Sequence, residues 1–194
     1  MRNIDIFQVP QPTTVMARTS SITNAFVNGI IPSITPTEKE IGVVLDLLGM
    51  NADTICCAYC GGHYSEWDHF RPIVKDKKPT GYITEINNLV PSCNKCNSSK
   101  GNRKWREWIE SSAKLSPKTR GVEGLNTIVE RLETYERYTN DKCVCLDFEN
   151  IVSKTKWEEH WNNHKKLLYE MRQAQTLSNE IKNELAQYVK TQKK

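Results

Sequence analysis

The stretch from Cys57 to Gly101 reads CAYCGGHYSEWDHFRPIVKDKKPTGYITEINNLVPSCNKCNSSKG and holds most of the reactive side chains of this chain of 194 residues. It contains two Cys-x-x-Cys pairs, Cys57 with Cys60 and Cys93 with Cys96. Each pair supplies two sulfurs from one turn, and four thiolates in a tetrahedron are a preferred ligand set of structural zinc. We therefore expect a four-cysteine zinc site that joins the two ends of the stretch.

The remaining cysteines and the histidines offer weaker metal sites. Cys56 could stand in for the first ligand, although the Cys-x3-Cys spacing that it would create is less typical. Cys143 and Cys145 have no second pair nearby, so we expect unligated thiols. His160 and His164 lie four residues apart on a predicted helix but lack a third ligand, and we expect them to pack. The four paired cysteines remain the predicted zinc ligands.

The composition describes a folded and mildly basic protein. The net charge is +4, the pI is about 8.6 and hydrophobic residues make up 38% of the chain. No segment approaches the roughly 18 apolar residues of a membrane helix, and the first residues lack a signal-peptide pattern. Seven cysteines, four of them in pairs, favour a metal site in a reducing compartment over disulfides. We therefore expect a cytoplasmic protein with no membrane segment.

Local patterns inside the stretch predict two strands followed by a helix. Residues 64–69 have the pattern of a strand, and a Pro-Thr-Gly turn leads into a β-prone run at 82–84 that can pair with it. After the second cysteine pair, Trp105, Trp108 and Ile109 fall on neighbouring helical positions. The predicted order is β-β-α, and both tryptophans are expected to be core residues.

The amino-terminal flank divides into an arm and a helix. Residues 1–33 are rich in Thr, Ser, Asn and Pro and show no sustained period, so we expect an extended or loop-like arm. Thr35 can cap a helix over about residues 36–48, with Glu38 completing a capping box. This helix is expected to pack against the central stretch.

The carboxy-terminal flank is predicted to be mostly helical. Apolar residues at helical spacing from Leu125 to Tyr135 indicate a support helix. Residues 143–148 alternate weakly and could form a short strand. From about Thr155 the pattern is helical again, and it leaves open whether one kinked helix or two follow.

Three further motifs lie between and upon the cysteine pairs: DHxxP at 68–72, NLVPSC at 88–93 and CNSSKG at 96–101. Together with the pairs, and in this order, they resemble the HNH nuclease motif of the ββα-metal superfamily over about residues 55–104. The resemblance implies an α+β fold, with a ββα-metal core and a structural zinc site of four cysteines, embellished by amino-terminal and carboxy-terminal helices.

The resemblance also implies a role for four residues. Asp68 and Asn97 would hold one catalytic divalent ion, His69 would be the general base, and Asn88 would orient His69. A carboxylate with an amide oxygen suits Mg²⁺ or Mn²⁺. Neutral imidazole, with a pKa of about 6.5, can take a proton from water near neutral pH. The implied products are 5′-phosphate and 3′-hydroxyl ends.

Basic residues flank the motif and would attract the phosphates of double-stranded DNA. For each of them a solvated surface position is the alternative. The candidate DNA contacts are Arg71, Lys100, Arg103 and Lys104.

We expect a DNA endonuclease, and within that class a sequence-specific restriction enzyme. The alternatives are a homing or phage nicking enzyme, a zinc-dependent nucleic-acid-binding module without catalysis, and a nonspecific nuclease toxin. The predicted division is an arm with a support helix at 1–54, the nuclease core at 55–110, and a helical region for DNA recognition or dimerisation at 111–194. A homodimer is left open.

Overall fold

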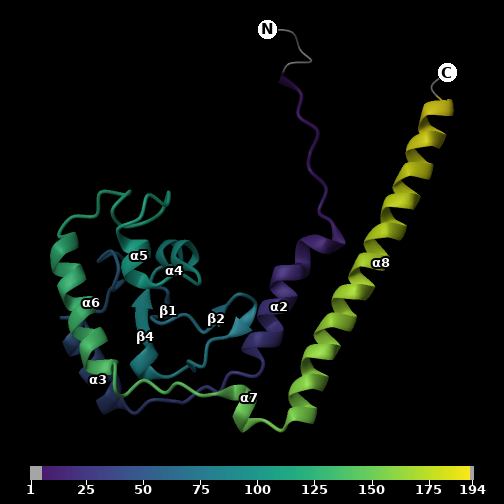
Figure 1. The fold of residues 1–194 in the computed structure, drawn as a ribbon. Helices are drawn as coiled ribbons and strands as arrows, with labels where there is room; N and C mark the ends of the chain where they lie inside the picture. The colour runs from purple at the N-terminus through teal and green to yellow at the C-terminus, as the bar shows by residue number, and fades with distance from the viewer. Residues whose placement is uncertain (1–5, 193–194) are drawn as a thin grey trace. The chain divides into compact units, whose positions relative to one another are not determined.

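The computed structural model describes residues 6–192, and they fold as two compact units (Figure 1). Residues 27–151 form one, called the central unit here, and the chain up to residue 26 joins residues from 152 onward in the other, called the helical unit. These boundaries differ from the predicted ones at 54 and 110, because helices on both sides of the cysteine-rich stretch pack into its core.

The described elements mix helices with short antiparallel strands, which confirms the predicted α+β class. No described helix is both long enough and apolar enough to cross a membrane. In chain order the elements are η1 (Val15–Arg18), α2 (Thr19–Asn28), α3 (Glu38–Leu47), β1 (Glu66–His69), β2 (Val74–Lys75), β3 (Lys78–Pro79), η2 (Ile86–Asn88), β4 (Leu89–Ser92), α4 (Asn94–Lys100), α5 (Trp105–Ile109), α6 (Leu125–Thr139), α7 (Phe148–Ile151) and α8 (Lys154–Gln192).

The centre of the fold is the antiparallel pair of β1 and β4, followed by α4. Its register places Glu66 opposite Ser92 and His69 opposite Leu89. The order β-β-α is thus as predicted, but the second strand is residues 89–92 and not 82–84. The predicted run instead makes isolated bridges, Tyr82 with Cys145 and Thr84 with Ser33.

Aromatic side chains fill the core of the central unit. Tyr59 meets Trp108 edge to face with ring centroids 5.3 Å apart, and Phe70 meets Tyr135 in the same way at 5.0 Å. Trp105 stacks on Phe70, so both tryptophans of this region are core residues as predicted. α3 and α6 add aliphatic side chains to the same cluster, which makes them part of the support for β1 and β4.

The capping of α3 differs from the prediction by two residues. Thr37 is the N-cap, and its hydroxyl and backbone amide form a capping box with Glu40. The helix ends before Gly49, whose φ of +69° suits glycine. A Cβ at Gly49 would lie 2.8 Å from Arg131 Nε, but that atom is at the end of a flexible side chain, so the positive φ is the stronger reason for glycine here.

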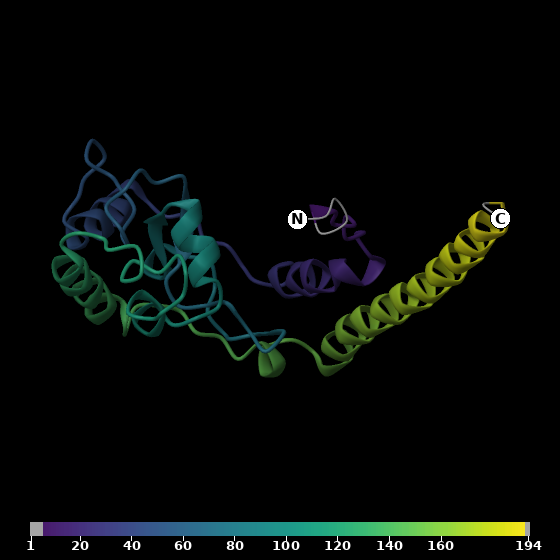
Figure 2. The ribbon, with the colours of Figure 1, turned by 90° about the horizontal axis from the view of Figure 1, so that it is seen from above.

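Two predictions for the flanks are wrong. Residues 1–33 contain η1 and α2 rather than only an extended arm, while residues 1–5 of that prediction lie outside the described residues. Residues 143–148 form a bridge at Cys145 and begin α7, without a strand. α8 is one continuous helix, which Figure 2 shows as a single rod.

The helical unit holds α2 against α8 through polar and ring contacts. Phe26 lies between His160 and His164, with centroids 5.1 and 5.0 Å away. Thr23 Oγ1 is 3.0 Å from His164 Nε2, and Gln175 accepts a hydrogen bond from the backbone N–H of Val15. The two histidines therefore pack, as predicted.

Candidate metal centres

The four paired cysteines meet at one point. Their sulfurs all lie within 4.8 Å of one another, and Cys60 Sγ is 3.9 Å from Cys93 Sγ. A tetrahedron with Zn–S bonds of about 2.3 Å places its sulfurs about 3.8 Å apart, so the cluster fits a structural zinc ion. Cys56 is not part of the group.

Local structure explains why the two pairs converge. The first pair sits on a turn before β1, where the N–H groups of Cys60 and Gly61 bond to the carbonyl of Cys57. The second pair begins α4, with Cys93 as its N-cap. Because β1 and β4 pair, and Ala58 N–H donates to Pro91 O at 2.8 Å, the turn and the helix start lie together.

Arg120, which no pattern in the sequence singles out, completes the surroundings of the cysteine cluster. Its guanidinium donates to Cys96 Sγ at 2.9 Å. The thiols also bond to one another: a hydrogen bond from Cys57 is the largest cause of a lowered pKa at Cys60, and the same contact raises the pKa of Cys57 to about 11. A cation beside the sulfurs favours thiolate, the form that binds metal.

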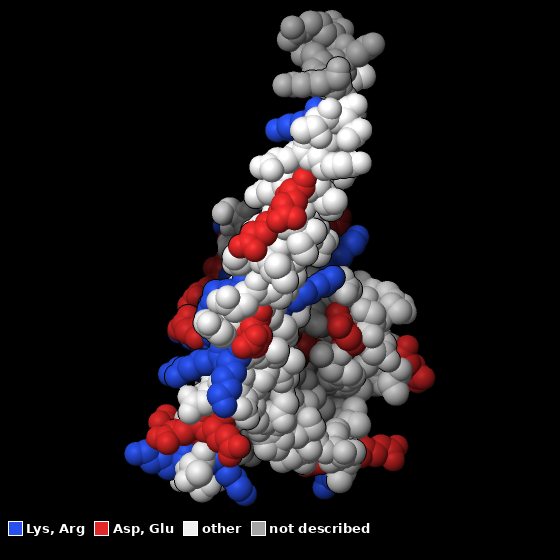
Figure 3. Space-filling view, turned by 90° about the vertical axis from the view of Figure 1, so that its right-hand side faces the viewer, with Lys and Arg blue, Asp and Glu red and all other residues white. Residues whose placement is uncertain are grey.

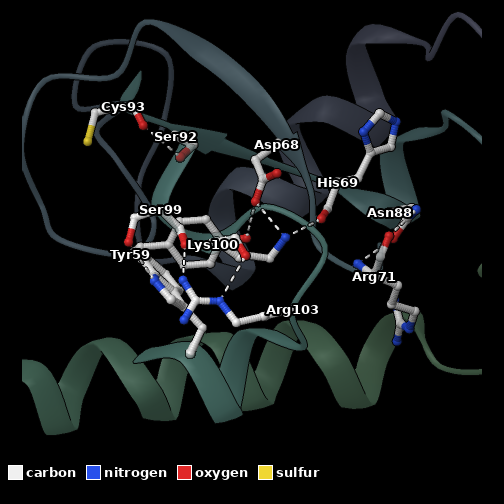
Figure 4. Close-up of polar contacts among 11 residues, drawn as sticks. Tyr59, Asp68, His69, Arg71, Asn88, Ser92, Cys93, Ser99, Lys100 and Arg103 are labelled. Carbon is white, nitrogen blue, oxygen red and sulfur yellow. Dashed lines mark hydrogen bonds and ion pairs between the residues drawn. The ribbon is translucent and has the colours of Figure 1, made fainter. Parts of the chain in front are cut away.

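Asp68 lies on β1 with its carboxylate turned into the protein, where the residue is 5% exposed. Its Oδ2 accepts a hydrogen bond from Tyr59 OH at 2.7 Å and lies 3.0 Å from Lys100 Nζ. Lys100 also donates to the carbonyl of His69 at 2.7 Å (Figure 4). Burial lowers the pKa of Lys100 against the opposing effect of Asp68, and burial followed by the Asp68 charge raises the pKa of Tyr59.

The two oxygens of Asp68 therefore have different surroundings. Tyr59 and Lys100 both bind Oδ2, whereas Oδ1 has no hydrogen bond to any residue between 6 and 192. A carboxylate held through one oxygen and open at the other is a suitable oxygen ligand for a hard divalent cation. Tyr59 belongs to the first cysteine turn, so the cysteine cluster and Asp68 are held by the same turn.

The His69 ring points to a different side of β1 from the Asp68 carboxylate (Figure 4). Its Nε2 lies 2.8 Å from Thr84 Oγ1, a partner that the sequence did not suggest. Thr84 is fixed by backbone bonds to Pro32 and Ile34. Burial is the largest cause of a lowered pKa at His69; Asp68 opposes this shift and Lys100 adds to it. A lowered pKa favours the neutral imidazole, which is the form that a general base requires.

Asn88 is fully buried and binds backbone rather than the His69 ring. Its Oδ1 accepts from Arg71 N–H at 2.8 Å, and its Nδ2 donates to the carbonyls of Arg71 and Ile83. Its own carbonyl accepts from Phe70 N–H at 2.8 Å. Asn88 holds the chain directly after His69, so any effect on the ring passes through the backbone.

Asn97 lies on α4, half-buried, three residues before Lys100. Within residues 6–192 its side chain makes no hydrogen bond, and no polar contact links it to Asp68. Its amide oxygen is therefore free to bind a cation.

Two predicted DNA contacts are interior residues. The Arg71 guanidinium is buried and donates to Thr139 Oγ1 at 3.1 Å and to the carbonyls of Asn87 and Glu136. Lys100 is 1% exposed and forms an ion pair with Asp68. The prediction that these two side chains bind phosphates is wrong for this structure, because neither reaches the surface.

The other two predicted contacts are exposed. Arg103 follows α4, and its guanidinium donates to the carbonyls of Ser99 and Lys100. Lys104 lies 3.7 Å from Glu107 in a surface ion pair, a contact of small energetic value. Both side chains remain available to a phosphate.

Replacing Lys100 by methionine tests the buried ion pair. Lys100→Met should lower the free energy of unfolding by about 3–5 kcal/mol, because it leaves the Asp68 carboxylate buried without its counter-ion. Chemical denaturation measures the change. The matched control, exposed Lys104→Met, should stay within about 0.5 kcal/mol of wild type. A Lys100→Met protein as stable as the control would contradict the ion pair.

Comparison with known families agrees with this geometry. Residues 57–103 match the model of the HNH endonuclease family. No curated protein and no solved structure matches the chain. Residues 57–103 are therefore an HNH endonuclease domain with four clustered cysteines that fit zinc. Such a domain points to a metal-dependent nuclease or a nucleic-acid-binding role.

Proposed function

We propose that the chain is a DNA endonuclease that hydrolyses phosphodiester bonds and leaves 5′-phosphate and 3′-hydroxyl ends. The observation that carries the proposal is that β1 ends on two adjacent residues of suitable chemistry. Among residues 6–192, Asp68 has no hydrogen-bond partner on Oδ1, and His69 has a lowered pKa. These two groups are the ligand and the base that hydrolysis of a phosphodiester requires. Their position inside an HNH domain supports the same interpretation.

Each residue has a distinct task in the proposed reaction. His69 Nδ1 or Nε2 takes a proton from the attacking water, and Thr84 and the backbone held by Asn88 fix the direction of the ring. Asp68 and Asn97 would hold the divalent cation, for which Mg²⁺ or Mn²⁺ is the best fit to two oxygen donors. When bound, such a cation supplies positive charge at the scissile phosphate.

Within this class we propose a sequence-specific restriction enzyme acting on double-stranded DNA in the cytoplasm. The support is the amount of folded chain beyond the HNH domain, since base recognition needs additional surface. Reduced thiolates at the cysteine cluster are consistent with a reducing compartment. The competing function is nucleic-acid binding without cleavage.

A homodimer is also proposed, with α8 as the contact surface. Leu177, Ile181 and Leu185 follow one another at intervals of four and are 57%, 50% and 62% exposed. Glu180 and Lys182 flank Ile181 on opposite sides, so in a parallel pair the acidic flank of one helix faces the basic flank of its copy. On the face that Figure 3 shows, charges of both signs are interspersed, which suits such a pair better than a polyanion. Sedimentation equilibrium of the intact chain measures this state.

Digestion of plasmid and phage DNA tests the function. The zinc-containing protein should cut DNA with Mg²⁺ and stop cutting when EDTA is added. Asn97→Ala should require more Mg²⁺ for the same rate, because one of the two oxygen donors is gone. Sequencing of the ends distinguishes discrete sites from random cleavage. Folded protein that binds DNA but leaves it intact at every metal concentration would replace the nuclease with the binding function.

A further inference from the structure

Residues 74–79 form a two-stranded hairpin that none of the assigned roles uses. β2 and β3 pair with Val74 opposite Pro79 and Lys75 opposite Lys78. Asp76 and Lys77 make the turn, with φ of +50° and +64°. Positive φ at both central residues is the mark of a type I′ turn, which joins strands closely and defines where the tip points. The segment is thus an ordered projection.

Three lysines occupy this hairpin at positions that folding alone does not favour. Lys75 and Lys78 are exposed and directly opposite each other, and like charges in such a pair destabilise a hairpin. Lys77 stands at the second turn position, where glycine is preferred because other side chains are strained at positive φ. Among residues 6–192, no carboxylate lies within 4.0 Å of any of the three ammonium groups. A polyanion would supply the missing counter-charge.

The base of the hairpin lies only a few residues along the chain from the proposed catalytic histidine. His69 Nε2 lies 2.8 Å from Thr84 Oγ1. Thr80, four residues before Thr84, closes the base of the hairpin, because its hydroxyl donates to Pro72 O at 2.7 Å and its N–H donates to Ile73 O at 3.1 Å. The paired strands β2 and β3 lie directly beyond these hydrogen bonds. Extended chain rises about 3.3 Å per residue, so Lys75 lies at most about 20 Å from His69. Successive nucleotides of one strand rise about 3.4 Å along the axis of the duplex, so this reach covers at most roughly six nucleotides along that axis.

We propose that Lys75, Lys77 and Lys78, called the lysine hairpin, bind backbone phosphates of duplex DNA close to the bond that is cut. The inference rests on the proposed function, since it assigns the DNA contact to the same site. It also replaces Arg71 and Lys100, whose side chains are buried, with residues that solvent reaches. The hairpin contacts phosphates and thereby fixes the position of the duplex against His69.

The salt dependence of DNA binding tests the lysine hairpin. Affinity for a short labelled duplex is measured by fluorescence anisotropy, without divalent metal, at a series of salt concentrations. The variant carries Lys75→Gln, Lys77→Gln and Lys78→Gln. Its slope of log affinity against log salt should be smaller by about 0.9 for each lysine that contacts a phosphate. The matched control removes the same charge from exposed lysines elsewhere, as Lys39→Gln, Lys154→Gln and Lys190→Gln.

A single substitution separates binding from folding. Lys77→Gly gives the turn the Asp-Gly sequence that type I′ geometry prefers, so the melting temperature should stay the same or rise. Affinity for the duplex should nevertheless fall, with a smaller salt slope. A purely structural role for Lys77 would not produce this combination.

The outcomes distinguish the hairpin from the nuclease. If the wild type cleaves DNA while the triple glutamine variant keeps the affinity and slope of its control, the lysine hairpin is wrong and the endonuclease stands. If the wild type neither binds nor cleaves DNA, both proposals fail. A variant that loses salt slope while the control does not supports the phosphate contacts.

Discussion

Removal of zinc is expected to unfold the central unit. Structural zinc contributes apparent binding energies of about 10–16 kcal/mol in small zinc modules, which is comparable with the about 5–15 kcal/mol that keeps a whole domain folded. Here the four sulfurs join the turn before β1 to the start of α4, and Tyr59 within that turn reaches Trp108 and Asp68. Loss of the metal therefore removes the support of the strands and of the carboxylate together.

Cys96→Ser, with or without a strong chelator, is the variant that measures this dependence. We expect loss of bound zinc by elemental analysis and loss of the cooperative thermal transition by circular dichroism. Cys145→Ser is the matched control, because Cys145 is exposed and lies outside the cysteine cluster. A zinc-free protein that keeps a wild-type melting temperature would contradict the structural zinc site.

The second large effect is expected at His69. His69→Ala should lower the rate of DNA cleavage by about 10²–10⁴-fold, the usual contribution of a general base, while affinity for DNA stays near wild type. Single-turnover cleavage and anisotropy measure the two quantities separately. Because the ring is only half-buried, the substitution should leave the melting temperature close to that of wild type.

Thr84→Val provides the control for His69. It removes the hydroxyl near Nε2 but keeps the imidazole, so a smaller loss of rate is expected than for His69→Ala. Equal loss of cleavage and of DNA affinity in His69→Ala would remove the assignment of a general base. A His69→Ala protein that cleaves at the wild-type rate would do the same.

The cluster of four cysteines and the support helices could be predicted from the sequence, because their signals are local. Two Cys-x-x-Cys turns fix the ligand spacing within each pair, and the apolar period from Leu125 to Tyr135 lies within one helix. The predicted partner of β1 is wrong because residues 82–84 have the stronger β propensity. Since the cysteine pairs must converge, the segment next to Cys93 has to pair with the segment that follows Cys60, and this constraint outweighs propensity.

No local pattern in the sequence indicates that Arg71 and Lys100 are buried or that α2 is a helix. Lys100 is buried because it pairs with Asp68 on β1, 32 positions earlier in the chain. Arg71 is buried because it binds Thr139 and Glu136 on α6. These partners are distant in the sequence, so the sequence alone does not identify them. The Thr- and Ser-rich residues of α2 show no clear period, and their helix is stabilised by rings and hydroxyl contacts from α8. Tertiary contacts therefore determine the burial of the two cations and stabilise α2.

One unit is a continuous segment and the other is made of two separate segments, and this division sets the order in which they can fold during synthesis. Residues 27–151 are synthesised as one continuous segment, and they can fold and bind zinc once α4 and α6 have left the ribosome. α2 begins before that unit is made, but its partner α8 is made after it. α2 therefore stays without its partner α8 while the segment between them folds, and closure of the helical unit follows folding of the central unit.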